Sequence, residues 1–118
     1  MAKLLTTSTD FGTLAGHLAG RYQKTIGNNT VLRDAGPGAI AVRLHGTDVV
    51  TVLADGSVTL DSGGYWTSTT KDRINAFARQ LGVSVHSYDY EWRLTLRNGN
   101  TVAWRDGVTL DQSGEVIA

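Results

Sequence analysis

The chain has 118 residues, and its eleven basic and eleven acidic side chains give a formal net charge of zero. This length predicts a single domain, residues 1–118, with its own hydrophobic core. The charge balance excludes a polybasic arm for nucleic acid, and the absence of cysteine excludes disulfides and thiolate metal sites. Because no apolar run approaches the roughly 20 residues that span a bilayer, we expect a cytoplasmic protein that does not contact membranes.

A first helix is predicted over residues 10–22, with Asp10 as the residue that caps its first turn. Large apolar side chains share one face of it: Phe11, Leu14, Leu18 and Tyr22. Three glycines follow one another at intervals of four: Gly12, Gly16 and Gly20. Each costs about 1 kcal/mol of helix propensity relative to alanine. The stripe allows a second backbone to approach closely, which predicts a homo-oligomer; a partly frayed helix is the alternative.

A second helix is predicted over residues 70–81. The segment Thr69–Asp72 resembles a capping box with aspartate in place of glutamate, and Gly82 stands where a left-handed cap ends a helix. A buried stripe runs through Ile74, Phe77, Ala78 and Leu81.

The other segments are predicted as short strands, because the chain is rich in glycine, threonine and valine and has one proline. The expected strands are 31–33, 39–45, 48–54, 57–60, 83–88, 90–97, 101–104 and 108–110. Asp55-Gly56 predicts a type I′ hairpin and Asn98-Gly99 a second hairpin. The predicted fold is therefore α+β, mainly antiparallel β hairpins that form a meander or a half-open barrel, with two helices.

A weak internal repeat of about fifty residues accompanies this pattern. Residues 55–63 read DGSVTLDSG and residues 106–114 read DGVTLDQSG. A duplicated unit of one helix and three strands is one interpretation. Turn chemistry shared by unrelated hairpins is the other.

The segment before the second helix is the first candidate binding site. Gly63 and Gly64 allow close backbone approach, two aromatic residues follow, and hydroxyls and cations then surround a helix start, where anions bind well. The candidate residues are Tyr65, Trp66, Thr69, Thr70, Lys71, Arg73, Asn75 and Arg79. In the alternative interpretation, the aromatic residues complete the core and the threonines cap the helix.

A second candidate surface combines aromatic and basic side chains, as surfaces that stack nucleic-acid bases do. Its residues are Tyr88, Tyr90, Trp92, Arg93 and Arg97, with Trp104 and Arg105 nearby. Tyr88, Tyr90 and Trp92 stand at positions i, i+2 and i+4 and are expected to share a strand face. The alternative is that these aromatic rings form the core.

Catalytic patterns are scarce in the chain. We predict no catalytic residue, no metal site and no cofactor, because no two histidines are spaced for a helical metal pair and no phosphate-binding or nucleophile motif occurs. The one enzymatic alternative is a small hydrolase or nuclease that uses His45 and Asp48.

Four segments carry a resemblance to a known group of proteins: NNTVL at 28–32, VRLHGT at 42–47, SGGY at 62–65 and TTKDRIN at 69–75. The sequence resembles small proteins of tailed bacteriophages and prophages, often of actinobacterial hosts. The resemblance implies an accessory protein in the cytoplasm of the bacterial host, with no settled biochemical role. We therefore expect a non-enzymatic protein that docks on a host protein, such as a defence or replication component. Binding of nucleic acid or a phosphorylated ligand at Thr69–Arg73 is the alternative.

Overall fold

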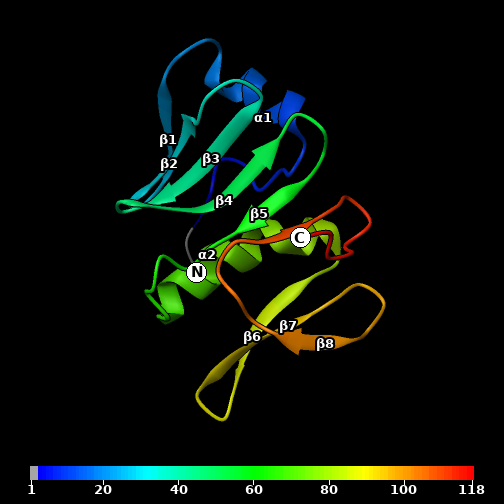
Figure 1. Cartoon of the computed structure of the whole chain (residues 1–118). Helices are drawn as coiled ribbons and strands as arrows, with labels where there is room; N and C mark the ends of the chain where they lie inside the picture. The colour runs from blue at the N-terminus through cyan, green and yellow to red at the C-terminus, as the bar shows by residue number, and fades with distance from the viewer. Residues whose placement is uncertain (1–2) are drawn as a thin grey trace.

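The computed structural model describes residues 3–118, which form two helices and nine strands in two antiparallel sheets (Figure 1). Five strands of the larger sheet follow one another as a meander: β1 (Gln23–Gly27), β2 (Thr30–Asp34), β3 (Ala39–Leu44), β4 (Thr47–Leu53) and β5 (Val58–Leu60). The final strand, β9 (Val108–Leu110), pairs with β5 as its sixth member. The smaller sheet consists of β6 (Ser84–Tyr88), β7 (Glu91–Thr95) and β8 (Thr101–Ala103). The predicted α+β fold is confirmed, and the sheets do not close into a barrel.

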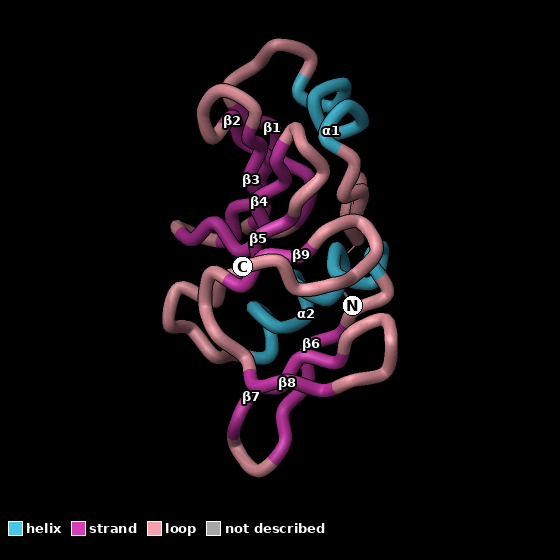
Figure 2. The backbone as a smooth tube through the Cα atoms, turned by 45° about the vertical axis from the view of Figure 1, so that its right-hand side comes forward, coloured by secondary structure: helices cyan, strands magenta, loops and turns pink. Residues whose placement is uncertain are grey.

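The second helix, α2 (Ser68–Ala78), lies between the two sheets in both views of the backbone (Figures 1 and 2). Its apolar stripe is fully buried at Ile74, Phe77 and Ala78, and a short 3-10 turn, η1 (Arg79–Leu81), extends it. The first helix, α1 (Phe11–Leu18), packs against β1, β2 and β3. The small sheet is thus attached to the larger one mainly through α2.

The first helix is shorter than the sequence predicts. Asp10 does cap it, accepting a hydrogen bond from the Thr13 N–H at 2.9 Å. Ala19, however, adopts a left-handed conformation with φ of 51° and ends the helix. Gly20 and Tyr22 therefore lie beyond the helix, and only Gly12 and Gly16 of the glycine stripe are helical.

The second helix begins earlier than predicted. Its cap is Thr67, whose hydroxyl accepts from the Thr70 N–H at 3.2 Å, so the predicted capping box at Thr69–Asp72 is wrong. The helix end is confirmed, because Gly82 is left-handed with φ of 76°.

The hairpin predicted at Asn98-Gly99 joins β7 to β8, but the turn at Asp55-Gly56 differs from its predicted type. A type I′ turn needs a positive φ at both central residues. In the β4–β5 turn Gly56 has a positive φ but Asp55 does not, so the turn is not type I′. Asp89-Tyr90, between β6 and β7, is a two-residue turn with both members at positive φ although neither is glycine. The sequence also gave no sign of β1, which pairs with β2.

The two similar segments of the sequence lie side by side in the larger sheet. β5 and β9 pair antiparallel with Thr59 opposite Thr109, and their hydroxyl oxygens are 2.9 Å apart. After β8 the chain leaves the small sheet, and β9 completes the large one.

Candidate functional site

The segment before α2 borders a pocket of about 480 Å³. One side of it is the turn between β3 and β4, and the other is the start of α2. Its lining residues are Leu44, His45, Gly46, Thr47, Val49, Tyr65, Thr67, Thr69 and Thr70. The structure thus brings three of the predicted binding residues together with His45, which the sequence placed in a separate hypothesis.

Gly63 makes the close backbone approach that the sequence predicts, and the neighbour is Thr47 of the same chain. A Cβ at Gly63 would overlap the Thr47 side chain, and the residue also has a positive φ of 62°. Glycine at this position therefore lets the loop pack against β4 and shapes one wall of the pocket.

Arg73 belongs to the interior, which the sequence analysis missed. Only 5% of its surface is exposed. Its Nε donates to the Thr30 hydroxyl at 2.9 Å, its Nη2 to the Asn28 carbonyl at 3.3 Å, and its Nη1 forms an ion pair with Asp72. Arg73 therefore fastens α2 to the start of β2 and supplies no cation to the surface.

Of the other predicted residues of this helix, some lie at the surface and others are buried or support the fold. Lys71 Nζ donates to the Ser87 hydroxyl at 3.1 Å, and Thr70 is buried. Asn75 binds the backbone of β6 as a neighbouring strand would: Val85 N–H donates to Asn75 Oδ1 at 2.7 Å, and Asn75 Nδ2 donates to the Val85 carbonyl at 2.8 Å. Arg79 is exposed beyond the end of the helix.

His45 and Asp48 have separate environments. Asp48 accepts hydrogen bonds from Arg33 and Arg43, with its two ion pairs at 2.7 and 3.0 Å. Burial raises the pKa of the Asp48 carboxyl, but the two arginines outweigh it and the pKa is lowered overall. Among residues 3–118 no hydrogen bond joins His45 to Asp48, so this carboxylate does not orient the imidazole.

A stack of three tryptophans joins the loop before α2 to the small sheet. The Trp66 and Trp92 rings stack with centroids 5.4 Å apart, and Trp104 meets Trp92 edge-on at the same distance. Trp92 and Trp104 are buried, whereas Trp66 is 47% exposed. Trp92 does not share a face with Tyr88 and Tyr90, because Asp89 and Tyr90 form the turn between β6 and β7. Trp92 and Trp104 instead belong to the core, as the alternative interpretation expects.

The exposed aromatic residues of the small sheet lie at the tip of the β6–β7 hairpin. Tyr88 is 64% and Tyr90 99% exposed. Arg93 lies over the Tyr88 ring, with its Cζ 5.2 Å from the ring centroid. We call Tyr88, Tyr90 and Arg93 the hairpin surface. Figures 1 and 2 both show this hairpin extending from one end of the molecule.

Arg93 has an unsatisfied hydrogen-bond donor. Its Nε is buried without a partner, and the whole guanidinium makes no hydrogen bond or ion pair with residues 3–118. The Arg97 side chain, by contrast, packs against Gly82 and Gly114. Its carbon atoms occupy the space that a Cβ on either glycine would need. Arg97 is therefore a packing residue, while Arg93 is the free cation of the hairpin surface.

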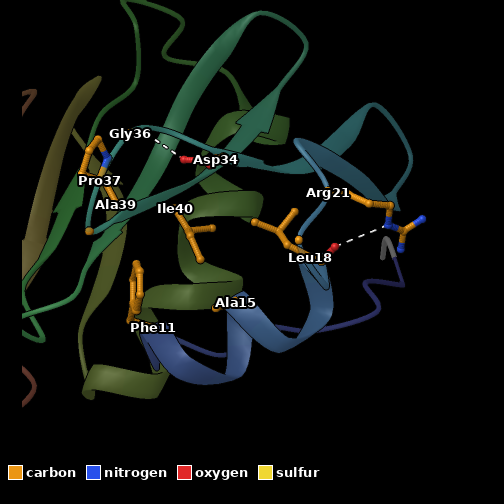
Figure 3. A pocket seen from close by; sticks show the side chains of 11 residues that line it. Phe11, Ala15, Leu18, Arg21, Asp34, Gly36, Pro37, Ala39 and Ile40 are labelled. Carbon is orange, nitrogen blue, oxygen red and sulfur yellow. Dashed lines mark hydrogen bonds between the residues drawn. The ribbon is translucent and has the colours of Figure 1, made fainter.

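A second pocket, of about 440 Å³, lies between α1 and β3 (Figure 3). Its apolar walls come from Phe11, Ala15, Leu18 and Ile40, and Arg21 points away from its centre. Phe11 and Leu18 share one face of the helix, as the sequence predicts, and the Gly36–Gly38 turn also lines the pocket.

The described residues show neither metal ligands nor a membrane span. No three histidine, aspartate or glutamate side chains among residues 3–118 are grouped to hold a metal ion. In the same range, neither helix combines the length and apolarity needed to cross a bilayer.

Comparison with known proteins gives one match. Residues 17–111 match the family model described as "Kyanoviridae Gp96 protein", a phage protein family. No curated protein matches the chain, and no solved structure matches it.

Proposed function

The chain belongs to the Kyanoviridae Gp96 family of phage proteins, and we propose that it acts without catalysis, by docking on a host protein through the hairpin surface. The host protein is of the defence or replication type, and the interaction takes place in the host cytoplasm. One observation carries the proposal: a fully exposed tyrosine stands on a strained turn at the end of a protruding hairpin.

The strain at the turn argues for a role of Tyr90 outside the fold. Asp89 and Tyr90 have φ values of 53° and 67°. The left-handed conformation costs about 1–2 kcal/mol for a residue with a side chain, and asparagine or glycine would fit this turn far better. Tyr90 packs so little that 99% of it stays exposed. Strain of this kind gathers at functional sites.

The chemistry of the hairpin surface fits a protein interface. Tyrosine and arginine are the residues that most often dominate binding energy, because they combine a large apolar area with hydrogen-bonding groups. Tyr88 already holds the Arg93 guanidinium in one orientation, so little side-chain entropy remains to be lost when a partner binds.

A second candidate function is binding of a small phosphorylated ligand in the pocket beside α2. The pocket gathers His45, Tyr65 and Thr69 at the helix start. Its test is thermal unfolding with added nucleotides, because a ligand at a hundredfold above its Kd stabilises the fold by about 2.7 kcal/mol. An unchanged melting temperature across a nucleotide panel would remove this candidate. Nucleic-acid binding at the same place is disfavoured by the burial of Arg73.

The docking proposal is tested by capture from nuclease-treated host lysate with tagged protein. Tyr88→Ala is compared with Tyr22→Ala, because both tyrosines are 64% exposed and Tyr22 lies outside the hairpin. We expect one host protein to be captured by the wild type and by Tyr22→Ala and lost with Tyr88→Ala. Equal capture by both variants would refute the hairpin surface. In a parallel capture from lysate without nuclease, recovery of nucleic acid alone would favour the nucleic-acid alternative.

A further inference from the structure

The strand edges of the two sheets are unequally protected. The Asn75 side chain occupies the edge of β6. The edge of β9 is covered by the C-terminal residues, since Ile117 N–H donates to the Thr109 carbonyl and Thr109 N–H to that of Ala118. At β1, Leu5 N–H donates to the Ile26 carbonyl. Within residues 3–118, nothing hydrogen-bonds to the backbone of β8 on its outer side.

The hydrogen-bond pattern shows which groups of β8 are free. Trp104 N–H donates to the Trp92 carbonyl, and Leu96 N–H donates to the Asn100 carbonyl. Bonded and non-bonded pairs alternate along an antiparallel ladder, so Val102, opposite Leu94, directs its backbone groups toward β7. The N–H and C=O groups of its two neighbours, Thr101 and Ala103, therefore point away from the sheet.

The side chains of β8 do nothing to block this edge. All three residues are exposed, and they are threonine, valine and alanine. Natural sheets protect edges with lysine, proline, bulges or a covering segment. An unprotected edge that presents free backbone groups is the usual acceptor of a partner's strand.

The charges beside β8 define what kind of strand fits. Arg93 lies directly opposite Ala103 in the β7–β8 register, and Arg105 follows two residues after Ala103. Arg105 forms no ion pair with any of the described residues. The guanidinium of Arg93 lies over the Tyr88 ring of β6, on the other side of β7 from β8, so Arg105 is the cation that a strand added beside β8 would meet.

We propose that β8 accepts an extended, acidic segment of the partner protein as a fourth strand of the small sheet. This inference rests on the proposed docking function and names the form of the partner. The segment forms backbone hydrogen bonds with Thr101 and Ala103, and its acidic side chains pair with Arg105.

The test uses a peptide of nine residues that alternates glutamate with valine, labelled for fluorescence anisotropy. Its control is the same peptide with lysine in place of glutamate. Ala103→Pro removes an outward N–H without touching the β7 ladder, and Ala103→Ser is the matched control that keeps it. We expect the acidic peptide to bind the wild type and Ala103→Ser about tenfold more tightly than it binds Ala103→Pro, and the lysine peptide to bind none of them. Should Ala103→Pro fail to fold, Thr101→Pro replaces it, with Thr101→Ala as control.

The outcomes separate this inference from the docking proposal. Equal binding of the two peptides, or binding insensitive to proline at both positions, would overturn strand addition. A wild-type dimer in sedimentation that Ala103→Pro converts to a monomer would also overturn it, because a second copy would then occupy the edge. Host-protein capture that needs Tyr88 but tolerates Ala103→Pro would leave docking intact and refute strand addition alone.

Discussion

Arg93 and Tyr88 form a cation–π pair across the β6–β7 hairpin, with the guanidinium carbon 5.2 Å from the ring centroid. The two residues lie on neighbouring strands but not directly opposite each other. Arg93 pairs with His86, and Tyr88 pairs with Glu91. The pair leaves the buried Nε of Arg93 without an acceptor. Within the chain, the arrangement thus keeps a cation in place without neutralising it.

We predict that Arg93→Met changes stability little and abolishes partner binding. The substitution keeps the apolar contact with Tyr88 and removes an unsatisfied donor, so the free energy of unfolding should stay within about 0.5 kcal/mol of the wild type. Denaturant unfolding and host-protein capture measure the two effects. A loss of several kcal/mol would show instead that Arg93 serves the fold. Arg79→Met, at an exposed position outside the hairpin, is the control.

Tyr90→Gly is expected to stabilise the protein while it weakens docking. Glycine adopts the left-handed conformation freely, whereas Tyr90→Ala removes the ring and keeps the strain. The glycine variant should therefore be more stable than the alanine variant by about 1 kcal/mol, although both lose binding. Equal stabilities in denaturant unfolding would mean that the turn is not strained.

Asn75→Ala should be one of the most destabilising polar substitutions in the chain. It removes both hydrogen bonds to Val85 and leaves one donor and one acceptor of β6 unpaired. Each of these groups that water does not reach should lower the free energy of unfolding by about 1–3 kcal/mol. Asn98→Ala, in an exposed turn, is the comparison and should cost far less. Hydrogen exchange supplies a second readout, because the Val85 amide should lose protection in Asn75→Ala only.

The pH dependence of stability is expected to involve Asp106. Burial raises the pKa of its carboxyl, but hydrogen bonds from Ser62 and Trp104 outweigh this effect and lower the pKa overall. Because the folded pKa lies below the unfolded value of about 3.9, the stabilisation is complete above that value and is lost as the pH falls through the folded pKa. Asp106→Asn should reduce stability at pH 7 and flatten its decline below pH 4. An unchanged acid limb of the unfolding curve would contradict this assignment.

The helices and most strands could be predicted because their signals are local. The apolar spacing from Ile74 to Leu81 and the left-handed Gly82 define where η1, the continuation of α2, ends, without reference to any other segment. The burial of Arg73 had a partial signal, since it lies four residues before Phe77 on the same helical face. The acceptors that allow this burial, Thr30 and the Asn28 carbonyl, are more than forty residues away, and no local pattern identifies them.

The hairpin surface was predicted in its residues but not in its geometry. Tyr88, Tyr90 and Trp92 alternate as strand residues do, so a shared face was the natural expectation. Tyrosine is unfavourable in a left-handed turn, and for that reason the Asp89-Tyr90 turn escaped prediction. The turn reverses the chain, which sends Trp92 into the core and leaves Tyr88 and Tyr90 outside. The alternation of side chains along a strand therefore gave a wrong prediction at the place where we propose that the protein binds its partner.

Site-specific photocrosslinking in host cells tests the docking account most directly. A photoreactive phenylalanine analogue replaces Tyr90 in one protein and Tyr22 in another, since both side chains are exposed but Tyr90 lies in the β6–β7 turn and Tyr22 directly before β1. The account predicts that one host protein is crosslinked from position 90 and not from position 22. Crosslinking from position 22 alone, or none from position 90 in cells where the protein is folded and abundant, would contradict it.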